Sequence, residues 1–228
     1  MKIKLPAFLL KKGTKIIIKP KPIDQQPELT KQEQTVIDDD ISRELKKNSS
    51  DALIESLKGP DPFIRALSAE VLGKLREKSA VETLIVALKD PSKYVKEKAA
   101  IALGLIGDKK AIPYLIEALE DTSEEVRVTV AGVLGHLRDK MAVPALIKIL
   151  KDPSPIARMK AAISLGIIKS PKAIRPLFEA TKDENELVRK YACEALGNIG
   201  KPAIPALLLA MKDEKVRTHV AQVLLKVR

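Results

Sequence analysis

The sequence predicts an all-α protein in which six pairs of helices stack as an α-solenoid. The first observation is an internal repeat of 31 residues, which recurs six times from Ser49 onward. The second is a helical spacing of apolar residues in both halves of each repeat, and the third is that equivalent positions carry the same residue type. A fixed period of this size is typical of solenoids, in which each unit buries its apolar face only against its neighbours.

Each repeat is expected to form two antiparallel helices, as the third repeat illustrates. In its first half, apolar residues recur at helical spacing from Ile112 to Leu119, and Pro113 lies in the first turn, where its missing N–H costs nothing. After a short polar turn, the apolar residues from Val126 to Leu137 lie on one face of a second helix. The six predicted units are residues 49–79, 80–110, 111–141, 142–172, 173–202 and 203–228.

Equivalent positions form columns that we expect to make the core between neighbouring units. One leucine column is Leu53, Leu84, Leu115, Leu146, Leu177 and Leu207, and a second is Leu72, Leu103, Leu134, Leu165, Leu196 and Leu224. A column of small residues, expected where two helix backbones approach closely, is Ala69, Ala100, Ala131, Ala162, Cys193 and Ala221. A glycine column, for which we also expect a packing role, is Gly73, Gly104, Gly135, Gly166 and Gly197.

A further column places an acid in the turn inside each unit and a base six residues later in the second helix. The pairs are Asp90/Lys96, Asp121/Arg127, Asp152/Arg158 and Asp183/Arg189, with a compressed pair Asp213/Arg217 in the shortened last repeat. The first unit has Gly59 at the acidic position, with Asp61 as a substitute partner for Arg65. We expect a structural role, because an aspartate oxygen can cap the second helix while the basic side chain ties it to the turn.

With these columns the chain resembles HEAT repeats, in the short form found in phycobilisome-lyase-type proteins. The resemblance rests on the leucine columns, on the turn aspartate with its base, and on stretches such as VKEKAAIALGLIG and VRKYACEALGNIG. It covers about four-fifths of the chain, from Asp51 onward. It implies a right-handed α-solenoid of HEAT-like repeats, whose second helices line a concave face and whose turn aspartates and bases form a ladder along the stack. It also implies a non-catalytic scaffold for protein–protein interactions.

The first 48 residues lie outside the repeat. Residues 35–48 are predicted to form an N-terminal capping helix for the first unit, with acids near its positive end and lysines near its negative end. Residues 1–34 are predicted to form a basic arm and a linker, because residues 1–22 hold seven lysines and no acid, and prolines punctuate the segment. We expect this arm to be flexible, to dock on the solenoid, or to form a short hairpin.

Motifs that carry chemistry are few, and we expect neither an enzyme nor a bound cofactor or metal ion. The sequence has no Gly-rich phosphate loop, no CxxC pair and no nucleophile elbow. Its histidines, His136 and His219, precede Leu and Val, whereas the metal-dependent deoxyhypusine hydroxylases of the HEAT superfamily carry His-Glu dipeptides. The one cysteine, Cys193, is expected to be a buried packing residue in a reducing compartment. An enzyme or lyase-like factor is therefore the least favoured function.

Composition and charge favour a cytoplasmic protein. The apolar run LPAFLL near the N-terminus is too short for a signal peptide, and no stretch approaches the length of a membrane span. The formal net charge is +11. Cations gather in the turns between units and predict a basic edge: Arg76, Lys78, Lys109, Lys110, Arg138, Lys140, Lys169, Lys172 and Lys201. Acids gather in the turns inside units, so these charges either solvate the loops or steer an acidic partner to one edge.

The second helices also carry a stripe of variable residues, which we expect to line a partner-binding groove. Its members are Lys98, Ile101, Leu105, Thr129, His136, Lys160, Ile163, Ile167, Tyr191, Glu194 and Asn198. Ile101 with Leu105, and Ile163 with Ile167, are apolar pairs beside lysines, which either suit an acidic, amphipathic partner segment or pack against a first helix. The alternative function is nucleic-acid binding through the basic edge and the N-terminal lysines. Weak self-association is expected through the last repeat.

Overall fold

The computed structural model describes residues 49–227, which belong to one compact unit of the chain. The predictions for residues 1–34 and 35–48 fall outside these described residues. Among residues 49–227 the regular elements are helices, with no β-strand. The all-α solenoid predicted from the repeat is therefore confirmed.

Each repeat forms a pair of helices, a short first helix and a longer second helix. The first helices are residues 49–56, α3 Val81–Ala87, α5 Ile112–Ala118, α7 Val143–Ile149, α9 Ile174–Ala180 and α11 Ile204–Ala210. The second helices are α2 Pro62–Lys74, α4 Lys93–Ile106, α6 Glu124–Leu137, α8 Pro155–Ile168, α10 Glu186–Ile199 and α12 Glu214–Leu224. A short 3-10 helix precedes five first helices: η3 Lys78–Ala80, η4 Lys109–Ala111, η5 Lys140–Ala142, η6 Pro171–Ala173 and η7 Lys201–Ala203.

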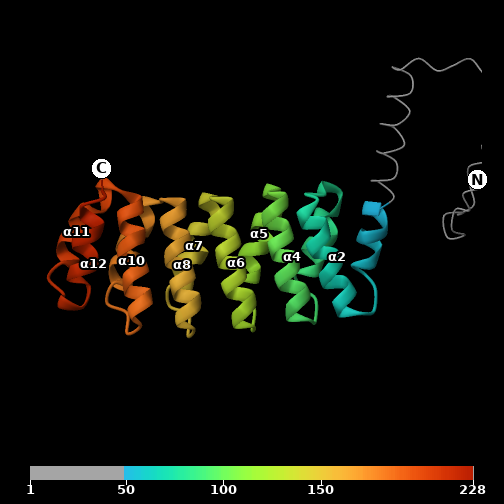
Figure 1. Cartoon of the computed structure of the whole chain (residues 1–228), viewed down its shortest axis with the longest axis horizontal. Coiled ribbons are helices and arrows are strands. Elements are labelled where there is room, and N and C mark those ends of the chain that lie inside the picture. Colours follow the sequence, from blue (N-terminus) through green and yellow to red (C-terminus); the bar gives the residue numbers. More distant parts are fainter. Residues whose placement is uncertain (1–48, 228) are drawn as a thin grey trace, which may run out of the picture. The chain divides into compact units, whose positions relative to one another are not determined.

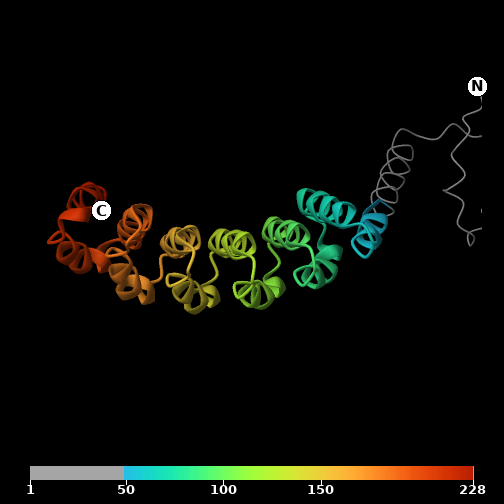
Figure 2. The same ribbon diagram turned by 90° about the horizontal axis from the view of Figure 1, so that it is seen from below.

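The helices of this unit form two layers. Figure 1 shows the pairs following one another in chain order, and Figure 2 shows the second helices in one layer and the first helices in the other. In Figure 2 the second helices lie on the inner side of the curve, so they line its concave side. Consecutive second helices pack directly against each other, as α2 does on α4 and α8 on α10.

Short polar side chains begin the second helices. The hydroxyl of Ser123 accepts a hydrogen bond from the N–H of Val126, and the side chain of Asn185 accepts from the N–H groups of Leu187 and Val188. These bonds satisfy amides that have no partner within the helix. The local sequence thus helps to specify where these long helices start.

The predicted columns form the core. All but the terminal members of both leucine columns are fully buried, and Leu53 and Leu224, in the first and last units, are half-buried. The small-residue column is also buried, including Cys193, with only Ala221 half-buried. Burial raises the pKa of the Cys193 thiol to about 12, so the thiol stays protonated and acts as a small apolar group.

The glycine column sets how closely the second helices approach. A Cβ atom on Gly73 would lie 2.6 Å from the Cα of Ala102, and one on Gly166 would lie 2.8 Å from the Cα of Ala195. Both distances are shorter than any tolerated carbon–carbon contact, and the obstructing atoms are backbone. These glycines are therefore packing residues, as predicted, and they bring α2 against the backbone of α4 and α8 against that of α10.

The turn aspartates and the basic column form a ladder in which each base binds the aspartate of the next unit. Nε and Nη2 of Arg127 donate to the two carboxylate oxygens of Asp152, at 2.7 and 2.9 Å. Nη1 of Arg127 donates to the main-chain carbonyls of Asp121 and Thr122 in its own unit. The equivalent pairs are Arg65–Asp90, Lys96–Asp121 and Arg158–Asp183.

The aspartates also organise the turns, but not as helix caps. Oδ1 of Asp152 accepts a hydrogen bond from the N–H of Ser154 at 2.8 Å, and it is Ser154 that caps α8. The expectation that the ladder aspartate itself caps the second helix is therefore wrong, because the cap lies two residues later. Burial raises the pKa of the Asp152 carboxyl, but the hydrogen bonds from Arg127 and Ser154 outweigh it and hold the pKa below its ordinary value.

The ladder ends at the shortened last unit. Nη1 of Arg189 keeps its bonds to the carbonyls of Asp183 and Glu184, but its buried Nε has no hydrogen-bond partner in the described chain. Asp213 instead caps α12 by accepting from the N–H of Lys215 at 2.9 Å. The shorter turn places Asp213 at the cap position, so it is not the ladder residue that the sequence predicted.

Arg217, the predicted base of that last unit, is not a ladder residue either. Its Nε donates to the main-chain carbonyl of Met211 at 3.2 Å, and its Nη2 lies 3.8 Å from the carboxylate of Glu214. Its side chain is 54% exposed, whereas that of Arg127 is 13% exposed. The predicted pairing of Asp213 with Arg217 is therefore wrong. The physical reason is that α12 is the last helix of the described stack, so no following turn within it offers Arg217 an aspartate.

The first unit departs from its prediction in a similar way. Asp61 caps α2 by accepting from the N–H of Phe63 at 2.8 Å, and Arg65 binds Asp90 together with the carbonyls of Gly59 and Pro60. Asp61 therefore does not replace the missing turn aspartate. The carbonyl groups of the turn serve Arg65 as they serve the other ladder arginines.

Candidate partner-binding surface

The predicted stripe lies on the second helices, and its members differ in exposure. Ile101 and Leu105 are exposed, by 40% and 38%, whereas Ile163 and Ile167 are half-buried. The first apolar pair is thus the more exposed of the two. Of the remaining members, His136 and Asn198 are exposed, and the half-buried ones are Lys98, Thr129, Lys160, Tyr191 and Glu194.

A cleft of about 460 Å³ lies between the N-terminal halves of α2 and α4. Its most exposed walls are aromatic: Phe63 of α2 is 71% exposed and Tyr94 of α4 is 66% exposed. Ala66 and Leu67 supply further apolar lining from α2. Aromatic residues make up only 3% of the chain, so two of them facing one open cleft are a concentrated apolar feature.

The charged side chains along this cleft pair with one another. Glu70 lies 2.6 Å from the ammonium of Lys74 and also pairs with Lys98 of α4. The hydrogen bonds from Lys74 and Lys98 lower the pKa of Glu70 to about 2, so its carboxylate is ionised at neutral pH. These three groups carry a net charge of +1, so the cleft presents no unpaired carboxylate and favours an apolar occupant whose flanking charges are acidic rather than basic.

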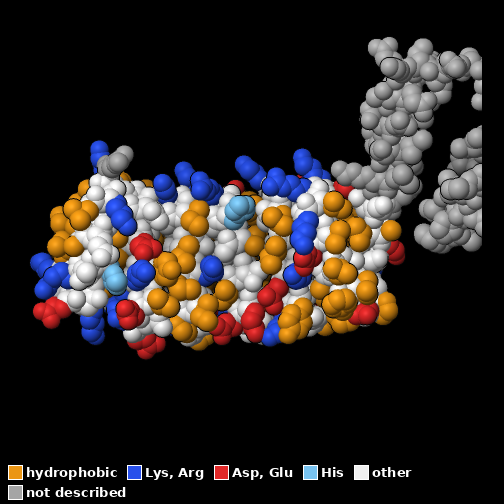
Figure 3. Space-filling view, in the orientation of Figure 1, with side chains coloured by type: hydrophobic (Ala, Val, Ile, Leu, Met, Phe, Trp, Pro, Cys, Tyr) orange, Lys and Arg blue, Asp and Glu red, His pale blue; other side chains and the backbone are white. Residues whose placement is uncertain are grey.

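The cleft continues into an apolar strip along α4. Tyr94, Ile101 and Leu105 follow one another from the first to the last turns of the helix and are all exposed. At 1.5 Å per residue, the eleven steps from Tyr94 to Leu105 extend about 16 Å, or three helical turns. Figure 3 looks onto this face and shows hydrophobic side chains gathered over α2 and α4.

Phe63 and Tyr94 are not among the residues predicted from the sequence, although a signal was present. They occupy equivalent positions in the first turn of the second helices, where the later units carry Glu125, Ile156, Leu187 and Lys215. A column of this kind, apolar in four units and charged in two, does not belong to a core. Comparing the first turns across the repeats could therefore have identified these exposed apolar residues.

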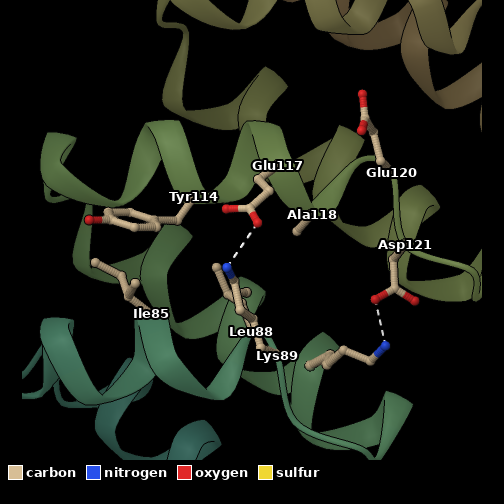
Figure 4. Close-up of a pocket in the computed structure, with 9 residues that line it drawn as sticks. Ile85, Leu88, Lys89, Tyr114, Glu117, Ala118, Glu120 and Asp121 are labelled. Carbon is tan, nitrogen blue, oxygen red and sulfur yellow. Dashed lines mark hydrogen bonds and ion pairs between the residues drawn. The ribbon is translucent and has the colours of Figure 1, made fainter.

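A second kind of groove lies between the first helices on the other side of the unit. Figure 4 shows the groove between α3 and α5, where the Lys89–Glu117 and Lys96–Asp121 ion pairs border Ile85, Leu88 and Tyr114. Similar grooves recur between α5 and α7 and between α7 and α9. Since a groove of this kind recurs at three junctions of the repeat, it is a weaker candidate than the aromatic cleft.

The charged edges differ from one another, as the turn composition predicted. Figure 3 shows a row of Lys and Arg side chains along the edge where the second helices end, and most of the acids toward the opposite edge. The nine cations predicted for the basic edge are all exposed. No three His, Cys, Asp or Glu side chains gather as a metal site within residues 49–227, and no helix there is long and apolar enough to cross a membrane.

Comparisons with known proteins agree with this architecture. The Escherichia coli protein YibA is 20% identical, with a TM-score of 0.62 over 81% of this chain and 69% of YibA. A designed armadillo repeat protein in complex with the peptide (KR)4 is 21% identical, with a TM-score of 0.57 over 78% of this chain and 98% of that chain. An engineered protein is 22% identical, with a TM-score of 0.57 over 78% and 96%.

No curated protein matches the sequence. The family model for HEAT repeats matches three overlapping segments, residues 50–124, 112–186 and 175–228, which together cover the whole repeat region. These segments contain the leucine columns, the ladder and the close-packed glycines described above. The chain therefore belongs to the HEAT-repeat family.

Proposed function

We propose that this protein is a non-catalytic scaffold that binds a partner protein on the concave side of its repeat unit, at the cleft between α2 and α4. The observation that carries the proposal is the exposure of Phe63 and Tyr94 around an open, apolar cleft. Exposed aromatic side chains are enriched at protein interfaces, where they fill pockets and become buried. A contiguous apolar patch rimmed by charges favours a docking role.

The shape of the strip favours a helical partner segment. The apolar residues of α4 extend about three helical turns, which matches a short amphipathic helix laid into the groove beside α2. Such a helix would place apolar side chains at positions i, i+7 and i+11 against Tyr94, Ile101 and Leu105. The aromatic rings of the cleft would receive its largest side chain.

Charge complementarity favours acidic residues on that partner. Arg76, Lys109 and Lys110 are exposed in the turns beside the C-terminal ends of α2 and α4, at the far end of the strip. The cleft itself holds no unpaired carboxylate, because Glu70 is neutralised by two lysines. The designed armadillo protein in complex with the peptide (KR)4 supports the proposal that a stack of helical repeats can hold a peptide segment, although that peptide is basic.

The test compares two sets of surface variants of the full chain. Phe63→Ser, Tyr94→Ser and Ile101→Ser remove the apolar strip, whereas Ile156→Ser and Leu187→Ser remove exposed apolar residues from the same face in later units. Immobilised proteins are incubated with nuclease-treated lysate of the source cells, and bound proteins are quantified by mass spectrometry. We expect a specific partner to be lost at least tenfold from the first set and retained by the second, with circular dichroism confirming that both sets fold. Equal capture by both sets would refute the proposed site.

A further inference from the structure

The basic edge is a row of cations that, with one exception, lack a carboxylate partner among the described residues. It consists of Arg76, Lys78, Lys109, Lys110, Arg138, Lys140, Lys169, Lys172 and Lys201, and all nine are exposed. Among the described residues, only Lys110 approaches a carboxylate, that of Glu82 at 3.9 Å. By contrast, most cations of the opposite edge and of the helix faces are paired, including Lys89 with Glu117 and Lys93 with Glu125.

The acids of the same turns do not neutralise this row. Asp108 accepts a hydrogen bond from the N–H of Lys110, and Asp139 accepts one from the N–H of Met141, each at 2.9 Å. Glu77 accepts from the N–H of Ser79 at 3.2 Å. All three carboxylates are half-buried, because each caps a 3-10 helix. The acids thus point into the turns while the cations extend into solvent.

Three of the cations occupy backbone positions that would favour glycine. Each turn between units contains one residue with positive φ, which is Gly107 or Gly200 in two turns and Arg76, Arg138 or Lys169 in the other three. The φ values of these three are 53°, 54° and 56°. A left-handed conformation costs a non-glycine residue about 1–2 kcal/mol, and the attraction of a cation to a helix C-terminus returns only about 0.3–1 kcal/mol. The chain thus carries a cation rather than glycine at three of the five helix ends, where glycine would be the less strained residue.

We infer that this edge binds the sugar–phosphate backbone of a duplex nucleic acid, independently of base sequence. The cleft lies at the opposite ends of α2 and α4, and although Arg76, Lys109 and Lys110 border the strip as well as the edge, the inference does not rest on the partner proposed for the cleft. A row made mainly of flexible lysines supplies point charges for phosphates and has no rigid donors for reading bases. A protein partner would require an apolar centre within its interface, and the edge is instead a line of separated charges.

The repeat sets the size of the footprint. Neighbouring helices pack about 8–10 Å apart, so the five turns from Arg76 to Lys201 extend roughly 40 Å. A duplex advances about 3.4 Å per base pair, so the edge would follow about 12 base pairs. Each phosphate neutralised lowers the slope of log K against log salt concentration by about 0.9. Binding should therefore weaken steeply with salt.

The test uses the full chain and a fluorescein-labelled 20-base-pair DNA duplex, in fluorescence anisotropy titrations at 50–200 mM NaCl. The edge variant carries Arg76→Gly, Arg138→Gly and Lys169→Gly, which remove three cations at positions where glycine relieves strain. The control variant carries Lys151→Gln, Lys182→Gln and Lys212→Gln, which remove three exposed cations from turns at the opposite edge. Both variants lose the same net charge and keep the N-terminal lysines.

We expect the edge variant to lower the magnitude of the salt slope by about 2–3 and to melt at the same or a higher temperature. The control should bind with the wild-type slope, and a duplex of scrambled sequence should bind equally well. Equal losses in the two variants would mean that net charge alone governs binding, and would overturn the assignment of the edge. Tighter binding of poly-glutamate than of the duplex at equal salt would replace the nucleic acid by an acidic polypeptide.

Discussion

Removal of a ladder arginine should destabilise the protein only where the ladder is intact. We compare Arg127→Ala with Arg189→Ala, since both arginines lie at equivalent positions of their second helices and both bind the carbonyls of their own turn. They differ in one respect. Arg127 holds the carboxylate of Asp152 through two hydrogen bonds, whereas Nε of Arg189 is buried without a partner.

The expected loss of stability depends on which polar groups each substitution leaves without a partner. The Asp152 side chain is only 5% exposed, so Arg127→Ala strands a nearly buried carboxylate. Breaking a buried ion pair costs about 3–5 kcal/mol, but Asp152 keeps its hydrogen bond from Ser154, so we expect a loss of about 2–3 kcal/mol. Arg189→Ala removes two hydrogen bonds to carbonyls and also an unsatisfied buried donor, so we expect a loss of about 0–1 kcal/mol.

The assay is urea unfolding of both variants and the wild type, followed by circular dichroism at 222 nm. A repeat protein can unfold in parts, so coincident transitions by a second probe are needed before free energies are compared. Arg127→Ala combined with Asp152→Asn should recover part of the loss, because the stranded charge is gone. An Arg189→Ala variant as unstable as Arg127→Ala would refute the view that the carboxylate pairing gives the ladder its stability.

Four further predictions test the packing, the charges and the surfaces. The pKa of Asp152 in the folded protein lies below its unfolded value, which is near 3.9, so the ionised carboxylate adds its full stability above about pH 4 and loses it as the pH falls further. In acid-unfolding curves, the difference in stability between the wild type and Asp152→Asn should therefore shrink below that pH. Gly166→Ala should lower the free energy of unfolding by about 1–3 kcal/mol, because the added Cβ atom would clash with α10 even though alanine is the better helix former by about 1 kcal/mol. A variant that is stabilised in urea unfolding would contradict the close approach of the two helices. Ile101→Ser should reduce partner capture tenfold with a change of only a few degrees in Tm, whereas Ile163→Ser, at a half-buried position, should mainly lower the Tm in calorimetry. Leu209, exposed on α11, should promote weak self-association that Leu209→Glu abolishes, and a wild-type monomer at high concentration in sedimentation velocity would count against it.

Much of the fold could be predicted from sequence because the same buried positions recur in each of the six repeats. Leucine at one position in every unit identifies a core column without any knowledge of the neighbours, and the fully buried Leu84 and Leu103 confirm this. Glycine recurring at the ends of the second helices likewise indicated close packing. The row of exposed cations was also predictable, since turns between in-phase units must lie along one edge.

The pairing of the ladder required the tertiary structure. The acid and base of one unit are six residues apart, and their separation along the chain does not reveal that the base reaches the aspartate of the following unit. The change of Asp213 from ladder residue to helix cap depends on how a turn two residues shorter closes, and Arg217 is left with the carbonyl of Met211 and a distant Glu214. Local sequence offers a carboxylate for either role, and only the geometry of the turn selects one.

For the candidate site, too, some features could be predicted from the sequence and others required the tertiary structure. The sequence alone determined that a variable stripe lies on the second helices, that the edges carry opposite charge, and that the core is made of columns. Only the tertiary structure decided that Ile101 is more exposed than Ile163, and that Phe63 and Tyr94 line one cleft. The physical reason is that exposure depends on the side chains contributed by neighbouring units. A repeat specifies which positions contact each other across each junction, whereas the sizes of the side chains at those positions differ from unit to unit.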